Sequence, residues 1–488
     1  MRRVLIAGAT GFIGRELGLA LARRGIALAV LTRRPEAACA ELPYPCRIYG
    51  WNGTLGSVPP EALDGVDAVV DLTGEPIAAG RWSTTRKARL RTSRITAARS
   101  LIQALLAARE RPRVYIQASA VGYYGDTGDQ PVDENTPSGR DFLAELCRDW
   151  EEPAHMLSTL GVRVVWMRMD IVLGLAGGAL PTLAALYQKG LGMLPGDGDQ
   201  WLSWISLSDA VRLYQEALLN DSVAGPINAA APVPCRYLQL HQAFAAIYGP
   251  GLPGRMPAPL LRLVLGEAAQ VLVTGQRAQP AAATALGFSF DHPTLQATLQ
   301  DLLGVGPTRD AAWVTSRQWV RGSPRDVGMF FTDETSLEDL TPSWLRLHRL
   351  SQSTPRLEEG TRIRYRFRIH GFPATWESLV SHAVPGSGLV DEQVVGPYDF
   401  WRHRQVFEAL GDGTVITDIV RYRLPFGRLG ACVAGWLVDR DLARILAYRR
   451  AAVARRFPSP STRLAETTCR TPRGMAPSPS PAPPHGAV

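Results

Sequence analysis

Short apolar runs alternate with helical patterns through the first half of the chain. The helical pattern is clearest directly after the first run, where Ile13, Leu17, Ala20 and Leu21 share one face. Continuous apolar runs are typical of strands buried on both faces of a parallel sheet. They occupy residues 4–6, 26–31, 67–72, 113–118 and 162–168. This alternation predicts a Rossmann-type α/β fold, a doubly wound parallel sheet with helices on both faces.

The second half of the chain has a two-residue alternation instead. In segment 362–369, Ile363, Tyr365, Phe367 and Ile369 alternate with arginines, which predicts a strand with one buried face and one basic face. A long helical pattern covers residues 433–457. We therefore expect an α+β region with an antiparallel sheet. Its other expected strands lie at residues 316–320, 376–380, 393–403 and 413–422.

The length of the chain, 488 residues, exceeds what one ordinary core holds, so at least two domains are expected. Gly and Pro at residues 304–307 break the pattern and mark a boundary. We expect a first domain over residues 1–303, a linker over 304–312 and a second domain over 313–457. The Pro- and Ser-rich tail, 458–488, has too little apolar surface to fold and is expected to be disordered.

The net charge of +8 does not point to nucleic acid, because the arginines are scattered along the chain. The basic face of segment 362–369 could serve as a nucleic-acid platform, but four arginines are more often simply the solvated face of an antiparallel sheet, so we expect no nucleic-acid partner. The chain contains no run of about 18 apolar residues, so the sequence predicts no membrane span. The six cysteines form no C-x-x-C pair, which favours a reducing compartment, and we expect a cytoplasmic protein. The oligomeric state is left open.

A glycine motif lies where the first strand turns into the first helix. Gly8, Gly11 and Gly14 form G-x-x-G-x-x-G, the pattern that allows a tight turn, close approach of a diphosphate and close helix packing. A glycine-rich turn without a ligand is the alternative interpretation. The motif predicts dinucleotide contacts from Gly8, Thr10, Gly11, Phe12, Ile13 and Gly14.

The end of the second expected strand favours NADP(H). A site for NAD(H) usually places an acid there, about 20 residues past the glycines, to bind the ribose. This chain has Arg33 and Arg34 instead, and an arginine fork can pair with a 2′-phosphate. Two solvated arginines are the alternative. Gly74, at the end of the third expected strand, and Ser119, at the end of the fourth, are further expected neighbours of the cofactor.

A hydroxyl and two phenols follow the fourth expected strand. Ser119, Tyr123 and Tyr124 are candidate catalytic residues, because such groups at a strand's carboxyl end can bind a carbonyl and pass a proton. A turn-capping serine and tyrosines packed over the sheet edge are the alternative. No pattern of metal ligands is present, and His370, His382 and His403 are expected to be surface or hydrogen-bonded histidines.

Residues 1–303 resemble the extended short-chain dehydrogenase/reductase superfamily, and more narrowly its atypical YfcH-like NAD-dependent epimerase/dehydratase family. Besides the glycine motif, the landmarks are residues 72–77, 81–82, 119–126, 141–145, 150–151, 172–174, 201–205 and 275–277. The resemblance implies that the glycines bind the cofactor's diphosphate, Arg33 its ribose phosphate, and that Ser119 corresponds to the superfamily's catalytic serine.

The chain departs from the superfamily at its second catalytic motif. Members of the superfamily use a Tyr-x-x-x-Lys pair one helix after the serine, whereas Phe142 and Leu146 occupy the corresponding positions here. Neither side chain can carry a proton. Tyr123 or Tyr124 could substitute, and an unassisted phenol, with a pKa of about 10, donates a proton more readily than it accepts one. Reduction is therefore the favoured direction.

Residues 313–457 resemble the helix-grip, START-like fold of the SRPBCC superfamily, in which strands wrap round a long C-terminal helix. The resemblance implies a cavity for an apolar ligand. Two functions remain open. One is an NADP(H)-dependent oxidoreductase or epimerase-like enzyme acting on a small carbonyl or hydroxyl substrate. The other is a non-catalytic NADP(H)-binding regulator or scaffold.

Overall fold

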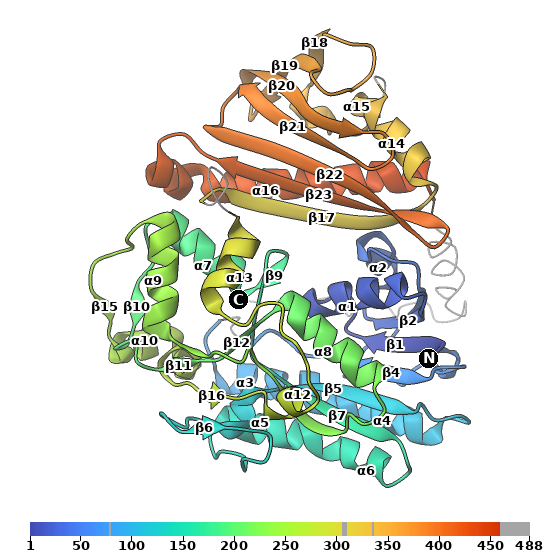
Figure 1. Cartoon of the computed structure of the whole chain (residues 1–488), viewed down its shortest axis with the longest axis vertical. Helices are drawn as coiled ribbons and strands as arrows, with labels where there is room; N and C mark the ends of the chain where they lie inside the picture. The colour runs from blue at the N-terminus through green and yellow to red at the C-terminus, as the bar shows by residue number, and fades with distance from the viewer. Residues whose placement is uncertain (78–79, 305–309, 334–335, 459–488) are drawn as a thin grey trace, which may run out of the picture.

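The computed structural model describes residues 1–77, 80–304, 310–333 and 336–458. Most of the expected linker, residues 305–309, and the expected disordered tail from residue 459 lie outside these ranges. Within them, two large sheets follow one another along the chain (Figure 1). No helix in the described part of the chain is long and apolar enough to cross a membrane.

The first sheet has seven parallel strands in the order β13-β7-β5-β4-β1-β2-β3, which confirms the Rossmann-like prediction. Each strand is a short, largely apolar segment, as the sequence pattern requires for burial on both faces. The strands are β1 (Arg3–Ala7), β2 (Ala27–Thr32), β3 (Arg47–Gly50), β4 (Ala68–Asp71), β5 (Val114–Ala120), β7 (Arg163–Met169) and β13 (Gly225–Ala229).

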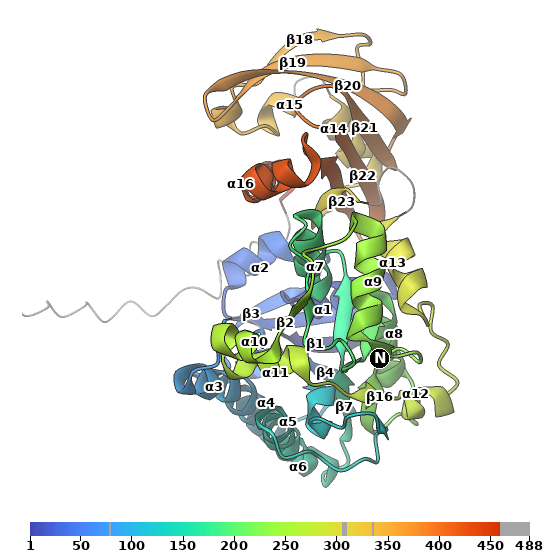
Figure 2. The same cartoon turned by 90° about the vertical axis from the view of Figure 1, so that its left-hand side faces the viewer.

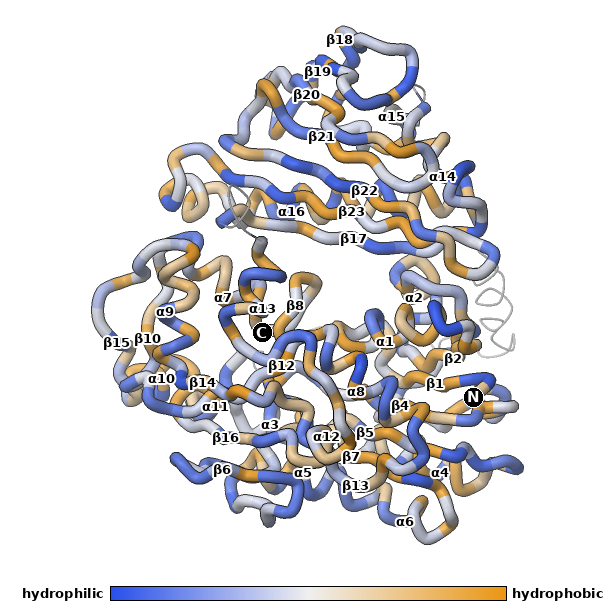
Figure 3. The backbone as a smooth tube through the Cα atoms, in the orientation of Figure 1, coloured by the Kyte–Doolittle hydropathy of each residue, from blue (hydrophilic) through white to orange (hydrophobic). Residues whose placement is uncertain are grey.

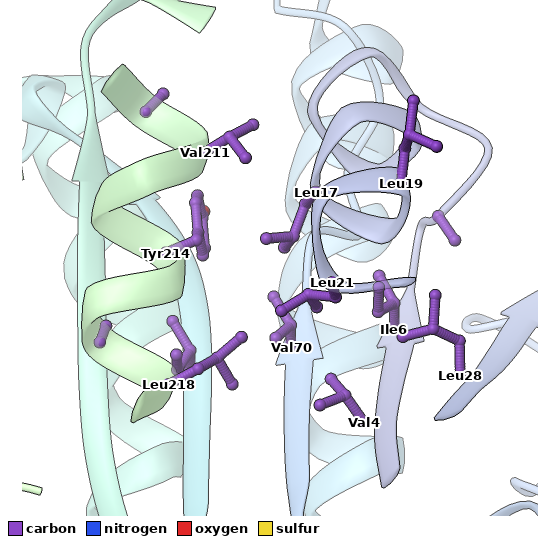
Figure 4. Packing of buried hydrophobic residues seen from close by; sticks show 14 of the residues in the cluster. Val4, Ile6, Leu17, Leu19, Leu21, Leu28, Val70, Val211, Tyr214 and Leu218 are labelled. Carbon is purple, nitrogen blue, oxygen red and sulfur yellow. The ribbon is translucent and has the colours of Figure 1, made fainter. Parts of the chain in front are cut away.

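Helices cover both faces of this sheet. Val4 and Ile6 of β1 pack in one core with α1 (Phe12–Arg23) and α8 (Leu207–Leu219), whose side chains lie together in Figure 4. Leu5, between them, packs in the opposite core with α4 (Ala97–Ala107). The alternation of side chains along a strand thus divides β1 between two apolar layers.

Two of the expected long helices are interrupted. Residues 83–108 form α3 (Thr84–Arg91), a π-helical turn (Thr92–Thr96) and α4. Residues 141–160 form α5 (Phe142–Glu151), a 3₁₀ turn (Glu152–Ala154) and α6 (His155–Ser158). Pro153 in the second segment lacks the N–H that a continuous helix needs, which accounts for that interruption.

Shorter elements surround the sheet and include a third apolar cluster around Leu180, Trp204 and Phe244. Helices among them are α2 (Pro35–Glu41), α7 (Ala179–Gln188), α9 (Tyr237–Tyr248), α10 (Ala258–Leu265), α11 (Gln270–Val273), α12 (Ala281–Ala285) and α13 (Leu295–Leu303). Short strands are β6 (Pro131–Val132), β8 (Ile171–Gly174), β9 (Gly177–Gly178), β10 (Leu194–Pro195), β11 (Trp201–Leu202), β12 (Trp204–Ser206), β14 (Cys235–Arg236), β15 (Arg255–Met256) and β16 (Arg277–Ala278).

The second sheet has seven antiparallel strands in the order β17-β23-β22-β21-β20-β19-β18. Polar and apolar residues alternate along its strands (Figure 3). The predicted two-faced strand is confirmed in β19, where the four arginines are exposed and the apolar residues between them are buried, apart from the half-buried Ile369 at the end. The strands are β17 (Ala312–Arg321), β18 (His348–Gln352), β19 (Arg362–Ile369), β20 (Phe372–Val384), β21 (Gly388–Val395), β22 (Phe400–Leu410) and β23 (Gly413–Arg423).

Three helices accompany the second sheet. The short helices α14 (Pro324–Thr332) and α15 (Ser336–Asp339) lie at one end, and α16 (Gly427–Arg456) lies across one face (Figure 2). The expected helix over 433–457 is thus present and begins six residues earlier, at Gly427.

Strand β17 joins the two sheets. Trp319 on β17 belongs to the same apolar core as α1, and the Arg317 guanidinium is paired with Glu16 on α1. The indole N–H of Trp313 donates to the Leu175 carbonyl at 2.9 Å. Helix α1 is therefore in contact with the second sheet through β17, which also contacts α2 and α7 (Figure 1).

Candidate functional site

The glycine motif forms the tight turn between β1 and α1. Gly8 has a φ of +81°, and a Cβ there would lie 2.8 Å from the Leu72 carbonyl oxygen. A Cβ on Gly14 would lie 2.6 Å from the Gly8 carbonyl oxygen. Gly11 precedes α1 without a side-chain cap, which leaves N–H groups at the helix start for an anion. The turn needs glycine for its shape and offers a place for phosphate.

A cavity of about 260 Å³ lies beside this turn, at the carboxyl ends of β1, β2 and β4. Of the predicted cofactor residues, it is lined by Gly8, Thr10, Gly11, Arg33 and Gly74. Asn52 and Ser93 also line it, and the sequence pattern did not mark them. The structure therefore brings five predicted cofactor residues to one cleft, which we call the glycine-turn cleft.

Four predicted contact residues lie outside the lining of the glycine-turn cleft, namely Ser119 at the end of β5 and three residues of α1. Phe12 packs against the β8–β9 hairpin, where a Cβ on Gly177 would approach its ring to 2.8 Å. Ile13 is half-buried against the first core, and Gly14 lies under Gly8. The three α1 residues support the turn from within the protein.

Arg33 and Arg34 differ in their positions. Both are exposed, but only Arg33 lines the glycine-turn cleft, directly after β2, whereas Arg34 precedes α2. A guanidinium at this end of β2 can meet a phosphate on the adenosine ribose.

The loop after β4 is held by arginines of the basic helical segment, to which the sequence assigned no role. Arg94, on the π-helical turn, is buried and donates to the Glu75 carbonyl oxygen at 2.8 Å. A Cβ on Gly74 would lie 3.1 Å from its guanidinium carbon. The Glu75 carboxylate pairs with Arg89 at 2.9 Å and with Arg86, and these contacts lower the pKa of Glu75. The π-helical turn thus shapes one wall of the glycine-turn cleft.

Ser119 and Tyr124 belong to a buried hydrogen-bonded chain. The Ser119 hydroxyl donates to Glu151 at 2.5 Å, and Glu151 forms an ion pair with Arg168 at 2.9 Å. Arg168 donates to the Tyr124 hydroxyl at 3.0 Å, and that hydroxyl donates to Asn228 at 2.7 Å. Each of these side chains is less than a tenth exposed. The five residues form what we call the Glu151–Arg168 network.

The network engages two of the three predicted catalytic residues. Ser119 is 3% exposed and points toward α5, because it shares a face of β5 with Tyr115 and Gln117. Burial raises the pKa of Tyr124 to about 12, although the nearby Arg168 charge lowers it in part. Tyr124 therefore stays protonated at neutral pH.

Tyr123 is placed differently. It is half-buried, and the Arg168 guanidinium lies 3.5 Å from its ring centroid. Within the described part of the chain, no side chain hydrogen-bonds its hydroxyl. Of the two phenols, Tyr123 is therefore the one whose hydroxyl is available to hydrogen-bond a ligand.

A second cleft, of about 690 Å³, opens beyond Tyr124. It is lined by Gly125, Arg140, Asp141, Arg262 and Gln270, among others. It lies between the start of α5 and the segment α10–α11, and Tyr124 is among its lining residues.

Phe142 and Leu146 are packing residues. Phe142 contacts Trp82 with ring centroids 5.3 Å apart, and Leu146 is 1% exposed in the same apolar cluster. Apolar contacts occupy the positions where the superfamily's tyrosine and lysine are expected.

Asp170 is a candidate that the sequence reasoning missed. It directly follows β7, one position past the residue paired with Ala120 at the end of β5. Its Oδ1 accepts from the Ile171 N–H at 2.8 Å, while its buried Oδ2 has no hydrogen-bond partner among the described residues. Burial raises the pKa of Asp170 to about 7. The sequence signal that could have identified Asp170 is an acidic residue directly after an apolar strand.

The second sheet and α16 enclose a third cavity, of about 290 Å³. His403 lines it and lies between Asp391 and Asp418, whereas His370 pairs with Asp441 at 2.7 Å. His382 is exposed, 3.7 Å from Glu359. No group of His, Cys, Asp and Glu within the described ranges is arranged to hold a metal ion.

Known proteins resemble the first part of the chain. The model of the NAD dependent epimerase/dehydratase family matches residues 4–230, and a domain of unknown function, DUF1731, matches residues 256–302. The chain is 40% identical to epimerase family protein Mb2239 of Mycobacterium bovis, over 63% of this chain and 98% of the relative. It is 38% identical to the chloroplastic SDR39U1 homolog of Arabidopsis thaliana, over 62% and 86%.

One solved structure is similar over the same region. The crystal structure of human epimerase family protein SDR39U1, isoform 2, with NADPH, has a TM-score of 0.53 and 28% identity. The match covers 62% of this chain and 98% of the human chain.

Proposed function

The chain belongs to the NAD-dependent epimerase/dehydratase family, and from that premise we propose that its parallel-sheet region binds NADP(H) and reduces a small carbonyl compound. The observation that carries the choice of cofactor is Arg33 in the glycine-turn cleft, at the place where a site for NAD(H) would carry an acid. The NADPH in the human relative's structure supports the same choice.

The residues of the glycine-turn cleft fit this cofactor. The N–H groups around Gly8, Thr10 and Gly11 would hold the diphosphate, Arg33 the 2′-phosphate, and Gly74 would leave room beside the cofactor. When bound, the reduced cofactor supplies a hydride to the carbonyl carbon.

Tyr123 is the residue that we assign to proton donation. The carbonyl oxygen gains the phenolic proton as the hydride arrives, so the product is an alcohol and the phenol becomes a phenolate. Arg168 lies over the Tyr123 ring and would stabilise that negative charge. Ser119 and Tyr124 act as positioning residues, because their hydroxyls hold the Glu151–Arg168 network together.

The matched variants Tyr123→Phe and Tyr124→Phe test this assignment. We expect the full chain to oxidise NADPH with at least one member of a panel of aldehydes and ketones that includes long-chain compounds. Tyr123→Phe should lower kcat by about 10²-fold or more while NADPH binding is unchanged. Tyr124→Phe should lower thermal stability and keep more activity than Tyr123→Phe. Full activity in Tyr123→Phe would overturn the assignment.

A non-catalytic NADP(H)-binding regulator is the second candidate. It is favoured by Phe142 and Leu146, whose packing replaces the superfamily's proton-transferring pair with apolar contacts. Tight NADPH binding with no oxidation across the whole panel would select this function over the reductase.

We assign a separate role to the second sheet. Residues 313–457 would form a helix-grip domain, after a first domain ending at residue 303, and its cavity would take an apolar ligand. The support is the 290 Å³ cavity under α16, whose lining is mainly aliphatic and aromatic.

A further inference from the structure

The cavity of the second sheet has a polar side and an apolar side. Aromatic rings from three strands form much of the apolar wall, among them Tyr365, Phe367, Trp376 and Trp401. Helix α16, which crosses the sheet in Figures 1 and 2, closes the opposite wall with residues such as Leu442. Burial raises the pKa of Tyr365 well above its usual value, as expected beside a dry cavity.

Asp391, His403 and Arg449 line the polar side, and Asp418, which pairs with His403 and Arg449, completes a cluster of four charged residues. His403 has Asp391 3.2 Å from Nδ1 and Asp418 3.0 Å from Nε2, so both ring nitrogens face carboxylates, an arrangement that favours the protonated ring. Arg449, from α16, lies 3.5 Å from Asp418. Burial alone would lower the pKa of His403, but the two carboxylates outweigh it and raise the pKa. Two cations therefore balance two anions.

Asp441 is a further charged residue of the cavity lining. Its Oδ2 is 2.7 Å from His370, whereas its buried Oδ1 is 3.6 Å from Arg440 and has no hydrogen-bond partner among the described residues. Gln405 donates to Asp418 at 2.9 Å. The cluster therefore has no net charge with which to attract an anionic or cationic ligand.

Two hydrogen-bond donors in the cavity lining have no acceptor. The indole Nε1 of Trp401 and the guanidinium Nε of Arg449 are both buried, and neither has a hydrogen-bond partner among the described residues. A buried N–H without an acceptor costs free energy, so such groups nearly always have a partner. Trp401 shares the cavity-facing side of β22 with His403, two residues away.

We propose that this cavity binds an uncharged apolar molecule that carries a ketone- or quinone-type oxygen, which accepts hydrogen bonds from Trp401 and Arg449. The proposal rests on the proposed apolar-ligand role of the second sheet and names the chemistry of the ligand. The neutral cluster disfavours a fatty-acid anion, and the unpaired donors disfavour a plain hydrocarbon. A volume of about 290 Å³ suits one ring system or one short chain.

Three probes of nearly the same shape separate these ligand classes. They are 1-tetralone, a neutral ketone; tetralin, the matching hydrocarbon; and 1,2,3,4-tetrahydro-1-naphthoate, the matching anion. We measure their binding to the full chain by isothermal titration calorimetry. We expect the ketone to bind about tenfold more tightly than either of the others.

Two variants locate the binding. Trp401→Phe keeps an aromatic ring but removes the N–H, so it should weaken 1-tetralone by roughly five- to tenfold and leave tetralin within about twofold. Val438→Trp adds a large side chain to the α16 wall and should abolish binding of all three probes. NADPH binding, measured on the same samples, should be unchanged in both variants.

Several results would overturn the proposal. Equal binding of ketone and hydrocarbon would mean that water satisfies the two donors. Tighter binding of the anion would contradict the neutral cluster, and ketone binding that survives Val438→Trp would place it outside this cavity. Absence of binding by all three probes would also overturn it. If the unchanged chain does not bind NADPH, that result would instead count against the function proposed for the first sheet.

Discussion

The parallel and the antiparallel sheets each bury a charged cluster, but the two clusters differ in how completely their polar atoms are paired. In the Glu151–Arg168 network, the hydroxyls of Ser119 and Tyr124 are both engaged. In the second sheet, the neutral cluster around His403 leaves the Trp401 and Arg449 donors unpaired beside a cavity. A fully paired network holds neighbouring groups in position, whereas unpaired donors at a cavity indicate a ligand.

The largest expected effect comes from breaking the paired network. Arg168→Leu leaves the Glu151 carboxylate buried without its counter-charge, so the free energy of unfolding should fall by about 3–5 kcal/mol. Urea unfolding of the full chain measures this loss. The control is Arg23→Ala, because the pair of Arg23 with Glu408 is about half exposed and should contribute less than about 1 kcal/mol. Similar losses in the two variants would contradict the structural role of the network.

Asp170 should make stability depend on pH. Its folded-state pKa is about 7, above the unfolded value of 3.8, so the stability of the folded chain is lost as the pH rises from about 3.8 to about 7 and stays low above that. Asp170→Asn removes this penalty. Its Tm should exceed that of the unchanged chain by about 4 °C or more at pH 8.5.

The comparison at low pH is the internal control for this variant. At pH 5 the difference between the two melting temperatures should be less than about half of that at pH 8.5, because the penalty grows from the unfolded pKa of 3.8 up to the folded pKa of about 7. Asp412→Asn, at an exposed position, should show no such dependence on pH. A Tm difference between Asp170→Asn and the unchanged chain that is the same at both pH values would rule out the raised pKa.

The smallest effect is expected where the two sheets meet. The pair of Arg317 with Glu16 on α1 is partly exposed, so Arg317→Ala should lower the free energy of unfolding by about 1 kcal/mol or less. NADPH affinity should stay within about twofold, because the shared apolar core around Trp319 keeps α1 in place. A loss of more than about 2 kcal/mol in urea unfolding would show that this ion pair, and not the core, joins the two sheets.

Local patterns account for much of what the sequence could predict. The apolar runs predicted five of the seven strands of the parallel sheet, but not β3 or β13, and the alternation in β19 predicted its two faces. The glycine motif predicted the turn, where a Cβ at Gly14 would collide with the Gly8 carbonyl. These features depend on neighbours a few residues apart, whereas the close contact of Gly8 with Leu72 does not.

What the sequence did not predict depends on contacts between distant residues. The chemistry of Ser119 could not be read from its place after an apolar run, since its side chain points to Glu151 on α5. The cluster around His403 in the second sheet brings together His403, Asp418 and Arg449 from two strands and a helix. No spacing rule marks such a set, and His403 alone was expected only to be a surface or hydrogen-bonded residue.

The relative affinity for the two dinucleotides tests the central claim most directly. Fluorescence titration of the full chain with NADPH and NADH should show at least about tenfold tighter binding of NADPH. Arg33→Ala should remove that preference, whereas Arg34→Ala, outside the glycine-turn cleft, should keep it. Equal or tighter binding of NADH by the unchanged chain, or an undiminished NADPH preference in Arg33→Ala, would contradict the account.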